Sequence, residues 1–125
     1  DKNISPQKYL HYNIPSYMKK CFTRLRLQSN RLEIVRGKYA RLKLPQEQRL
    51  CSSCKVIDDE EHLVIQCSVI ADLRERTFSS MSIYNKEFDR LSNREKTYVF
   101  LHPDSYKSAL IIGQFLIQAF KERNL

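Results

Sequence analysis

The spacing of apolar residues predicts a chain made mainly of helices. In the first third of the chain, apolar side chains recur three or four positions apart, and this period predicts a helix from about Tyr17 to Gln28. A second helical stripe of apolar residues begins near Asp58, where acidic residues suit a helix amino terminus. It extends to about Ser82, and the helix either continues through Ser68 or restarts there. The pattern therefore places helices on both sides of a polar middle segment.

Capping residues predict further helices towards the carboxyl end. Ser92 followed three residues later by Glu95 forms a capping box. The final helix begins at Asp104 or Ser105, and Gly113 within it is expected to be a point of close packing. Shorter helices are predicted after Ser5 and Asn85. At the carboxyl end of the last helix, the cations Lys121 and Arg123 suit the helix dipole.

The middle segment predicts short and irregular structure. The apolar run at residues 32–35 is closed by Gly37, which fits either a short helix with a glycine C-cap or an extended piece, and the pattern leaves both open. Pro45 excludes a continuous helix through segment 38–50. We expect a loop there that leads into a short strand at residues 49–50.

Length and composition are those of one small folded domain. The 125 residues are 42% hydrophobic and 29% charged, and they include only two glycines, which disfavours glycine-loop nucleotide sites and turn-rich sandwiches. No apolar run approaches the roughly 20 residues that span a bilayer, and the first residues lack the apolar stretch of a signal peptide. We expect an intracellular protein, in the nucleus or the cytoplasm, without a membrane partner. Because the chain does not begin with Met, we also expect it to be a piece or a processed product of a longer protein.

Positive charge is concentrated in the amino-terminal half. Residues 1–57 contain 13 Lys and Arg against 3 Asp and Glu, a net charge of +10, whereas residues 58–125 contain 9 against 11, a net charge of −2. A one-sided basic segment favours a polyanionic partner, because each phosphate that it neutralises releases condensed counterions. The alternative is a solvated surface that only keeps the protein soluble. The candidate nucleic-acid contacts are Lys19, Lys20, Arg24, Arg26, Arg31, Arg36, Lys38, Arg41 and Lys43.

Three cysteines and one histidine fall within 17 residues and have the spacing of a metal site. Cys51, Cys54, His62 and Cys67 follow the pattern C-x2-C-x7-H-x4-C. Tetrahedral zinc takes four nitrogen or sulfur ligands, and a C-x2-C turn lets two thiolates bind one ion. We therefore expect one structural zinc ion at these four residues, and no catalytic role, because four protein ligands leave no open position for water.

His62 and Cys67 can bind one ion only if the helix between them is interrupted. His62 and Cys67 are five residues apart, about one and a half turns of an α-helix, so they would not share a face of an unbroken helix. Either the helix ends or bends before Cys67, or Cys67 lies in the loop leading into the next helix.

Three other interpretations of the cysteines are less consistent with the sequence. A disulfide does not suit a basic protein without secretory features, and Cys-His catalysis would not require four matched ligand types. Buried cysteines without a metal are the main alternative, and the following H-x4-C pair argues against them. Cys21 lies in a helix stripe and is expected to be a small buried hydrophobe.

Longer stretches of the sequence resemble a known family. CFTRLRLQSNRLEIVRGKYAR, then RLCSSCKVIDDEEHLVIQC, then a helix with DLR, are similar to the carboxyl-terminal zinc-binding region of reverse transcriptases from non-LTR retrotransposons. The resemblance covers about residues 17–78, and the later FDRLSNREKTYVFL and ALIIGQFLIQAFKER look like the tail that follows this region in animal members. It implies that the four motif residues hold zinc and that the arginines of the basic segment engage element RNA or target DNA.

Together these features give one expectation for the whole chain. It is a single mainly α domain over residues 1–125 with a short zinc-binding CCHC insert, a knuckle or hairpin: a basic helical part at 1–50, the zinc motif at 51–67 and carboxyl-terminal helices at 68–125. We expect a non-catalytic accessory module that binds RNA or DNA, with the polymerase domain of a parent chain as a further partner and no small-molecule substrate. The alternative is a protein–protein interaction module of a host protein derived from such an element.

Overall fold

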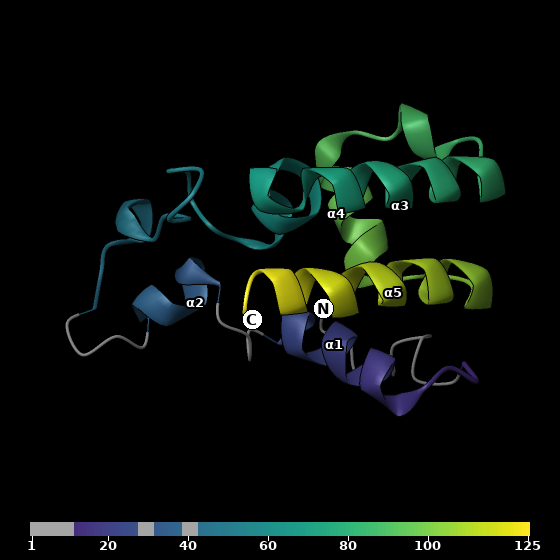
Figure 1. Ribbon diagram of the computed structural model, residues 1–125, viewed down its shortest axis with the longest axis horizontal. Helices are drawn as coiled ribbons and strands as arrows, with labels where there is room; N and C mark the ends of the chain where they lie inside the picture. The colour runs from purple at the N-terminus through teal and green to yellow at the C-terminus, as the bar shows by residue number, and fades with distance from the viewer. Residues whose placement is uncertain (1–11, 28–31, 39–42) are drawn as a thin grey trace.

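Helices make up most of the chain that the structure describes. The structure is a computed structural model that describes residues 12–27, 32–38 and 43–125 (Figure 1). The α-helices are α1 (Ser16–Arg26), α2 (Glu33–Lys38), α3 (Ala71–Tyr84), α4 (Asn93–Leu101) and α5 (Tyr106–Glu122). Shorter turns are η2 (Gln46–Gln48), η3 (His62–Gln66), η4 (Ser68–Ile70) and η5 (Phe88–Arg90). Over these ranges β-pairing is limited to one antiparallel bridge between Leu50 and Ile57, so the predicted mainly helical fold is confirmed.

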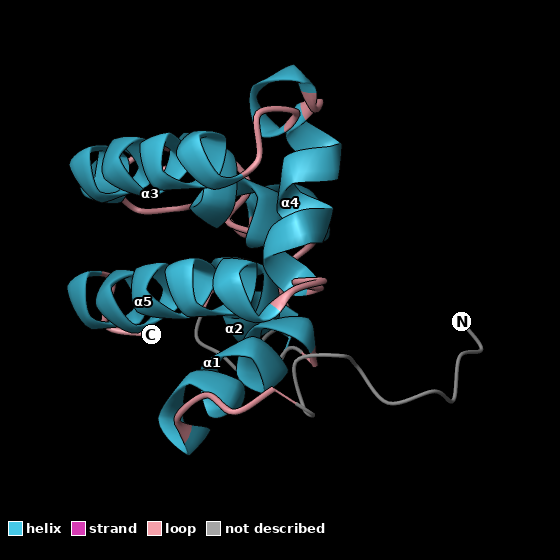
Figure 2. Ribbon diagram, turned by 90° about the vertical axis from the view of Figure 1, so that its right-hand side faces the viewer, coloured by secondary structure: helices cyan, strands magenta, loops and turns pink. Residues whose placement is uncertain are grey.

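The last helix lies at the centre of the molecule. Helix α5 packs between α3 and α1, and α4 crosses from the end of α3 towards α1 (Figures 1 and 2). Helix α2, η2 and the segment that carries the first two cysteines lie together beyond the carboxyl end of α5. The molecule therefore has a helical body and a smaller, irregular part at one end.

Aromatic rings join three helices in the body. Phe78 of α3 lies 5.2 Å from Phe88 and 5.8 Å from Phe100 between ring centroids, and Phe100 lies 5.2 Å from Phe115 of α5, all edge-to-face or nearly so. This is a favoured geometry for aromatic pairs. The rings fix α4 against the α3–α5 pair.

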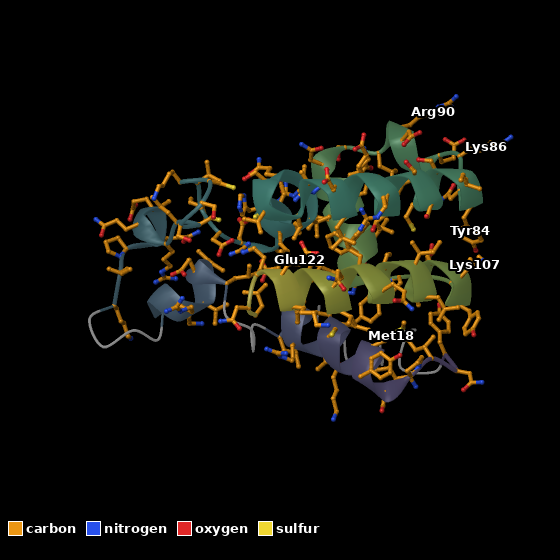
Figure 3. All side chains as sticks on the ribbon, viewed as in Figure 1. Met18, Tyr84, Lys86, Arg90, Lys107 and Glu122 are labelled. Carbon is orange, nitrogen blue, oxygen red and sulfur yellow. The ribbon has the colours of Figure 1, made fainter. Side chains whose placement is uncertain are left out.

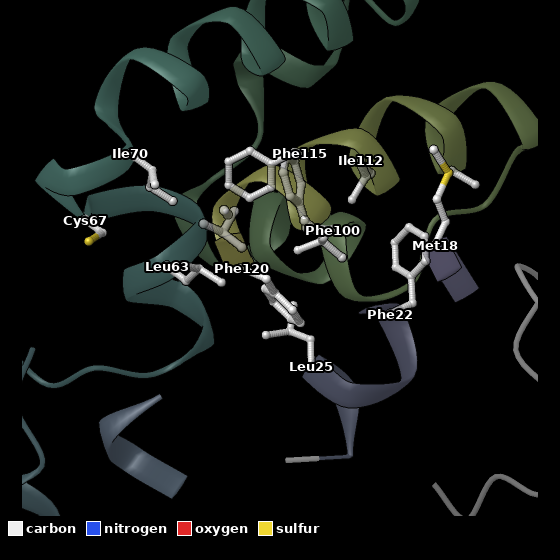
Figure 4. Packing of buried hydrophobic residues seen from close by; sticks show 14 of the residues in the cluster. Met18, Phe22, Leu25, Leu63, Cys67, Ile70, Phe100, Ile112, Phe115 and Phe120 are labelled. Carbon is white, nitrogen blue, oxygen red and sulfur yellow. The ribbon is translucent and has the colours of Figure 1, made fainter. Parts of the chain in front are cut away.

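Helix α1 covers the other side of α5 with the stripe that the sequence predicts. Met18, Phe22 and Leu25 are buried and face α5 (Figure 4). Gly113 allows the approach, because a Cβ built there would lie 2.8 Å from the Met18 sulfur. The predicted close-packing role of this glycine is confirmed.

Capping residues set the start of the last two long helices. Ser92 accepts a hydrogen bond from the Glu95 amide at 3.1 Å, and the Glu95 carboxylate accepts one from the Ser92 amide at 2.9 Å. Ser105 and Ser108 form a second reciprocal pair at the start of α5. Both predicted helix starts are confirmed.

The middle segment differs from two expectations. Residues 33–38 form a short helix, but Gly37 lies inside it rather than at its C-cap. A Cβ at Gly37 would lie 2.5 Å from Cγ of Arg49, so this position requires a close approach of side chain to backbone. The predicted strand at residues 49–50 is reduced to the single bridge at Leu50. The helix predicted after Ser5 lies outside the described residues.

Helices of the described ranges were also compared with the requirements of a bilayer. None of them is both long enough and apolar enough to cross a membrane.

Candidate metal centre

The structure brings the four motif residues together. The ligand atoms of Cys51, Cys54, His62 and Cys67 all lie within 4.8 Å of one another. Cys51, His62 and Cys67 are buried, and Cys54 is partly exposed. Ligands bound 2.0–2.3 Å from a common tetrahedral centre lie about 3.6–3.8 Å apart, so the atoms need to close by about 1 Å at most. The group can hold a metal ion.

A tight turn presents the first two cysteines. The bridge between Leu50 and Ile57 closes it, and the Cys51 amide donates to the Val56 carbonyl at 2.8 Å. The Lys55 amide donates a hydrogen bond to the Cys51 carbonyl at 2.8 Å, and Lys55 adopts a φ of 62°, the left-handed conformation that reverses the chain. This is the hairpin-like insert that the C-x2-C spacing predicts.

A change in helical winding presents the second pair. Residues His62–Gln66 form a π-helical turn, and the Cys67 amide donates to the His62 carbonyl at 2.8 Å. A turn closed between residues five apart is wider than an α-helical turn, so it brings the two ligands to the same side. Cys67 is extended, and η4 and α3 follow. The prediction that the helix bends or ends before Cys67 is confirmed.

Two polar side chains hold this turn in place. The Asp59 carboxylate accepts a hydrogen bond from the His62 amide at 2.9 Å, and the helical segment begins at Glu60, two residues after Asp58. Arg74 of α3 is buried and donates to the carbonyls of Val64 at 2.7 Å and Leu63 at 3.0 Å. Arg74 therefore satisfies carbonyl groups that the π turn would leave unpaired.

The hydrogen bonds of His62 fit a metal ligand. Its Nδ1 lies 3.4 Å from Oε1 of Gln66, to which it donates in the tautomer that carries the proton on Nδ1. In that tautomer Nε2 presents its lone pair; within the described part of the chain this buried atom has no hydrogen-bond partner and lies 4.0 Å from Oδ1 of Asp58. A metal ion that binds Nε2 would satisfy it, with Gln66 fixing the tautomer.

The thiols lie in different electrostatic surroundings. Ser68 donates to the Cys54 sulfur from its amide at 3.3 Å, and its hydroxyl also lies 3.3 Å away; these hydrogen bonds lower the pKa of Cys54. Burial raises the pKa of Cys67, while the positive charge of Arg123 opposes that effect. Cys21 is far from the group in sequence and half-buried in α1, and burial raises the pKa of its thiol.

Sequence reasoning missed an ion pair beside the site. Arg123, one residue beyond α5, lies 2.6 Å from Oδ2 of the fully buried Asp58 and donates to the Cys67 sulfur at 3.5 Å. Asp58 was interpreted as part of a helix amino terminus and Arg123 as a cation for the helix dipole. The partners are 65 residues apart, and no spacing rule in the sequence connects them.

The candidate nucleic-acid contacts are placed in three ways. Lys20, Arg36, Lys38 and Lys43 are exposed, and Lys19, Arg24 and Arg26 are partly exposed. Arg24 packs over the Phe120 ring at 5.1 Å and donates to the Leu125 carbonyl, so part of its role is structural. Arg36 pairs with Glu33 at 3.0 Å. Arg31 and Arg41 lie outside the described residues.

The chain was then compared with known proteins. No family model matches it, and no match was found among the curated proteins or the solved structures. The candidate metal centre and the basic residues are therefore the features that bear on its function.

Proposed function

We propose that this chain is a non-catalytic, zinc-stabilised module that binds RNA or DNA through its basic amino-terminal part. In this proposal it serves as an accessory domain of a reverse transcriptase of the retrotransposon type, as the resemblance of its motifs implies. The observation that carries the proposal is a largely buried three-cysteine, one-histidine group in a chain whose residues 1–57 carry a net charge of +10.

The donor set supports zinc among the metals that such a group can hold. Thiolate and imidazole ligands in a tetrahedral arrangement suit zinc, whereas calcium and magnesium prefer oxygen ligands. The four ligands come from two folded turns that the ion would hold together. Its role is then to stabilise the fold, because binding energy at such a site is folding energy.

Metal analysis tests this part of the proposal. Protein purified without chelator is expected to contain one zinc ion per chain, measured by elemental analysis. Cys51→Ser should lose the metal and melt at a lower temperature, whereas Cys21→Ser, a change of the same atoms outside the group, should keep it. Absence of zinc in the parent, or a Cys51→Ser variant that retains it, would refute the assignment.

One face of α1 supports nucleic-acid binding. An open hollow of about 390 Å³ is lined by polar residues that recur at helical spacing: Ser16, Lys19, Lys20, Thr23 and Arg24. These side chains offer hydroxyl, ammonium and guanidinium donors, and no carboxylate is among them. Phosphate oxygens accept hydrogen bonds from these groups. The buried stripe of Met18, Phe22 and Leu25 holds the opposite side of the helix in the core.

Further exposed cations lie in the part of the chain that carries the first two cysteines. Lys38 ends α2, Lys43 lies before η2, and Lys55 directly follows Cys54; all three are exposed. Figure 3 shows Lys86, Arg90 and Lys107 at the other end of the molecule, where acidic residues balance them. The two groups of cations allow a matched comparison.

Charge reversal tests the location of binding. Lys20→Glu with Lys43→Glu should weaken binding to RNA and DNA by about ten-fold near 0.15 M salt and flatten the salt dependence by about one unit per lost phosphate contact. Lys86→Glu with Lys107→Glu changes the net charge equally and should bind nearly as the parent does. Fluorescence anisotropy with RNA, single-stranded DNA and duplex DNA over a salt series measures both effects.

Two results would contradict the proposal. Equal losses in both double variants would show that net charge alone matters and that no face is specific. No measurable binding of the parent to any nucleic acid near 0.15 M salt, with capture of an acidic protein by the same basic residues, would establish a protein-interaction module instead.

A further inference from the structure

Asp58 is a buried junction between three parts of the fold. Its backbone amide donates to the Arg49 carbonyl at 2.9 Å, and its carbonyl accepts from the Ile34 amide at 3.0 Å. Its Oδ2 accepts from the Glu33 amide at the start of α2, at 2.9 Å, and pairs with Arg123. A fully buried carboxylate with a cationic partner that is only 10% exposed forms a desolvated ion pair.

Arg123 extends this junction to the metal centre. One of its nitrogens, Nη2, binds Asp58, and the other, Nη1, donates to the Cys67 sulfur at 3.5 Å. A planar guanidinium can serve both acceptors at once, which an ammonium group cannot do with the same fixed geometry. The same side chain therefore contacts a metal-ligand atom and the residue that anchors α2.

The charges at the site favour a cation at this position. Three thiolates and one neutral imidazole exceed the charge of a divalent ion by one negative charge. Asp58 adds a second negative charge and is fully buried. Arg74 also lies near the thiols, since their charges affect its pKa, but it donates to the carbonyl groups of Leu63 and Val64. Arg123 is the cation that donates to a thiol sulfur.

We propose that Arg123 is a positioning residue of the metal centre: it holds the Cys67 thiolate in place, offsets excess negative charge, and ties the metal to α2 through Asp58. This inference rests on the proposed metal binding. Partners of metal ligands outside the coordination sphere commonly contribute 10- to 100-fold to metal affinity, so its removal should have an effect of about that size.

Cobalt titration of three variants tests the proposal. Arg123→Gln removes both the positive charge and the planar guanidinium, whereas Arg123→Lys keeps only the charge. The control, Lys121→Gln, removes an exposed cation two residues away. Affinity is measured by competition with a chromophoric chelator, and the site is observed through the thiolate-to-cobalt absorption. Melting with and without metal is measured in parallel.

The expected order is specific to a role at the metal. Arg123→Gln should bind cobalt about 10- to 100-fold more weakly and change the thiolate absorption, Arg123→Lys should be intermediate, and Lys121→Gln should match the parent. An effect on stability alone would lower melting equally with and without metal and leave the affinity unchanged, and that result would overturn the proposal.

The remaining outcomes are equally decisive. If Arg123→Gln does not fold, Arg123→Lys decides: parental affinity and absorption would overturn the proposal, and weakened binding would support it. A parent that binds neither cobalt nor zinc would refute the metal-binding part of the proposed function and this inference together. If the parent and the Arg123→Gln variant bind metal equally well, that result would refute this inference and leave the proposed function intact.

Discussion

At the scale of single residues, Arg74 is the side chain on which the geometry of the second ligand pair depends. It is buried in α3, and its two hydrogen bonds reach the carbonyls of Leu63 and Val64 inside the π turn. Burial lowers the pKa of this arginine, which nevertheless remains charged because an arginine pKa lies far above neutral pH. Its role is to make a wide turn stable between two buried ligands.

Replacing Arg74 should therefore destabilise the protein more than a surface change does. Arg74→Met removes both donors and leaves two carbonyls unpaired, which is expected to lower the free energy of unfolding by about 2–4 kcal/mol. Arg76→Met, two residues further along the same helix on an exposed position, should change it by less than about 0.5 kcal/mol. Urea denaturation of both variants measures the difference.

The result also bears on the metal. If the π turn holds His62 and Cys67 in register, Arg74→Met should release cobalt more readily than Arg76→Met does. Equal stability of the two variants would contradict the structural role assigned to Arg74.

Residue-level prediction from the sequence succeeded in bringing the four candidate ligands together and failed for the residues that support them. The spacing of Cys51, Cys54, His62 and Cys67 identifies the cluster, because residues able to bind one ion lie close along this chain. Arg123 reaches Asp58 across 65 residues, and only the packing of α5 brings the two together. A buried ion pair leaves no local pattern, so it could not have been predicted from the sequence.

At the scale of elements, the contact of α1 with α5 depends on the absence of a side chain at Gly113. A Cβ there would lie 2.8 Å from Sδ and 3.3 Å from Cβ of Met18, which is itself buried. The helical propensity of alanine favours Gly113→Ala by about 1 kcal/mol, and overpacking opposes it by about 1–3 kcal/mol. The second effect is expected to be larger.

We predict that Gly113→Ala lowers the free energy of unfolding by about 1 kcal/mol. In a Met18→Ala background the same change should instead stabilise the protein, because the sulfur that it would meet is gone. Denaturation of the two single variants and the double variant gives the coupling. Stabilisation by Gly113→Ala in both backgrounds would show that the two helices do not make this contact.

Elements with local signals were predictable, and those set by distant contacts were not. The capping box at Ser92 and the start of α5 were identified because the residues that fix a helix start are neighbours in sequence. The sequence leaves residues 32–37 either as a short helix with Gly37 at its C-cap or as an extended piece; Gly37 lies within α2, where Arg49 packs across it and the Leu44 amide donates to its carbonyl. The π turn was expected only as an interruption, since spacing alone does not specify winding.

At the scale of the whole molecule, the body and the irregular end are held by different forces. Aromatic and aliphatic side chains bury each other between α3, α4 and α5. The end has few such contacts: η2 has no buried residue, and Leu44, Leu50, Val56 and Ile57 are exposed. The bonds of Asp58 and Arg49 link the parts of the irregular end and, through Arg123, tie it to the body, and a metal ion at the four candidate ligands would add to them.

Removing the metal should therefore loosen one end and spare the body. Hydrogen exchange with mass spectrometry is expected to show faster exchange of residues 43–57 and α2 in the presence of a chelator, with little change in α3 and α5. The Cys21→Ser variant should respond as the parent does, since it keeps all four ligands. A uniform increase over the whole chain would mean that the metal and the helical body form a single cooperative unit.

The distance along the chain between Asp58 and Arg123 has a consequence for synthesis. All four candidate metal ligands have been synthesised by residue 67, whereas the guanidinium that bonds to Cys67 follows 56 residues later. A nascent chain would thus have a complete set of ligands but lack their counter-cation until α5 has been made and has docked. Metal taken up during translation would be exchangeable at first and retained firmly only when the last helix closes on the site.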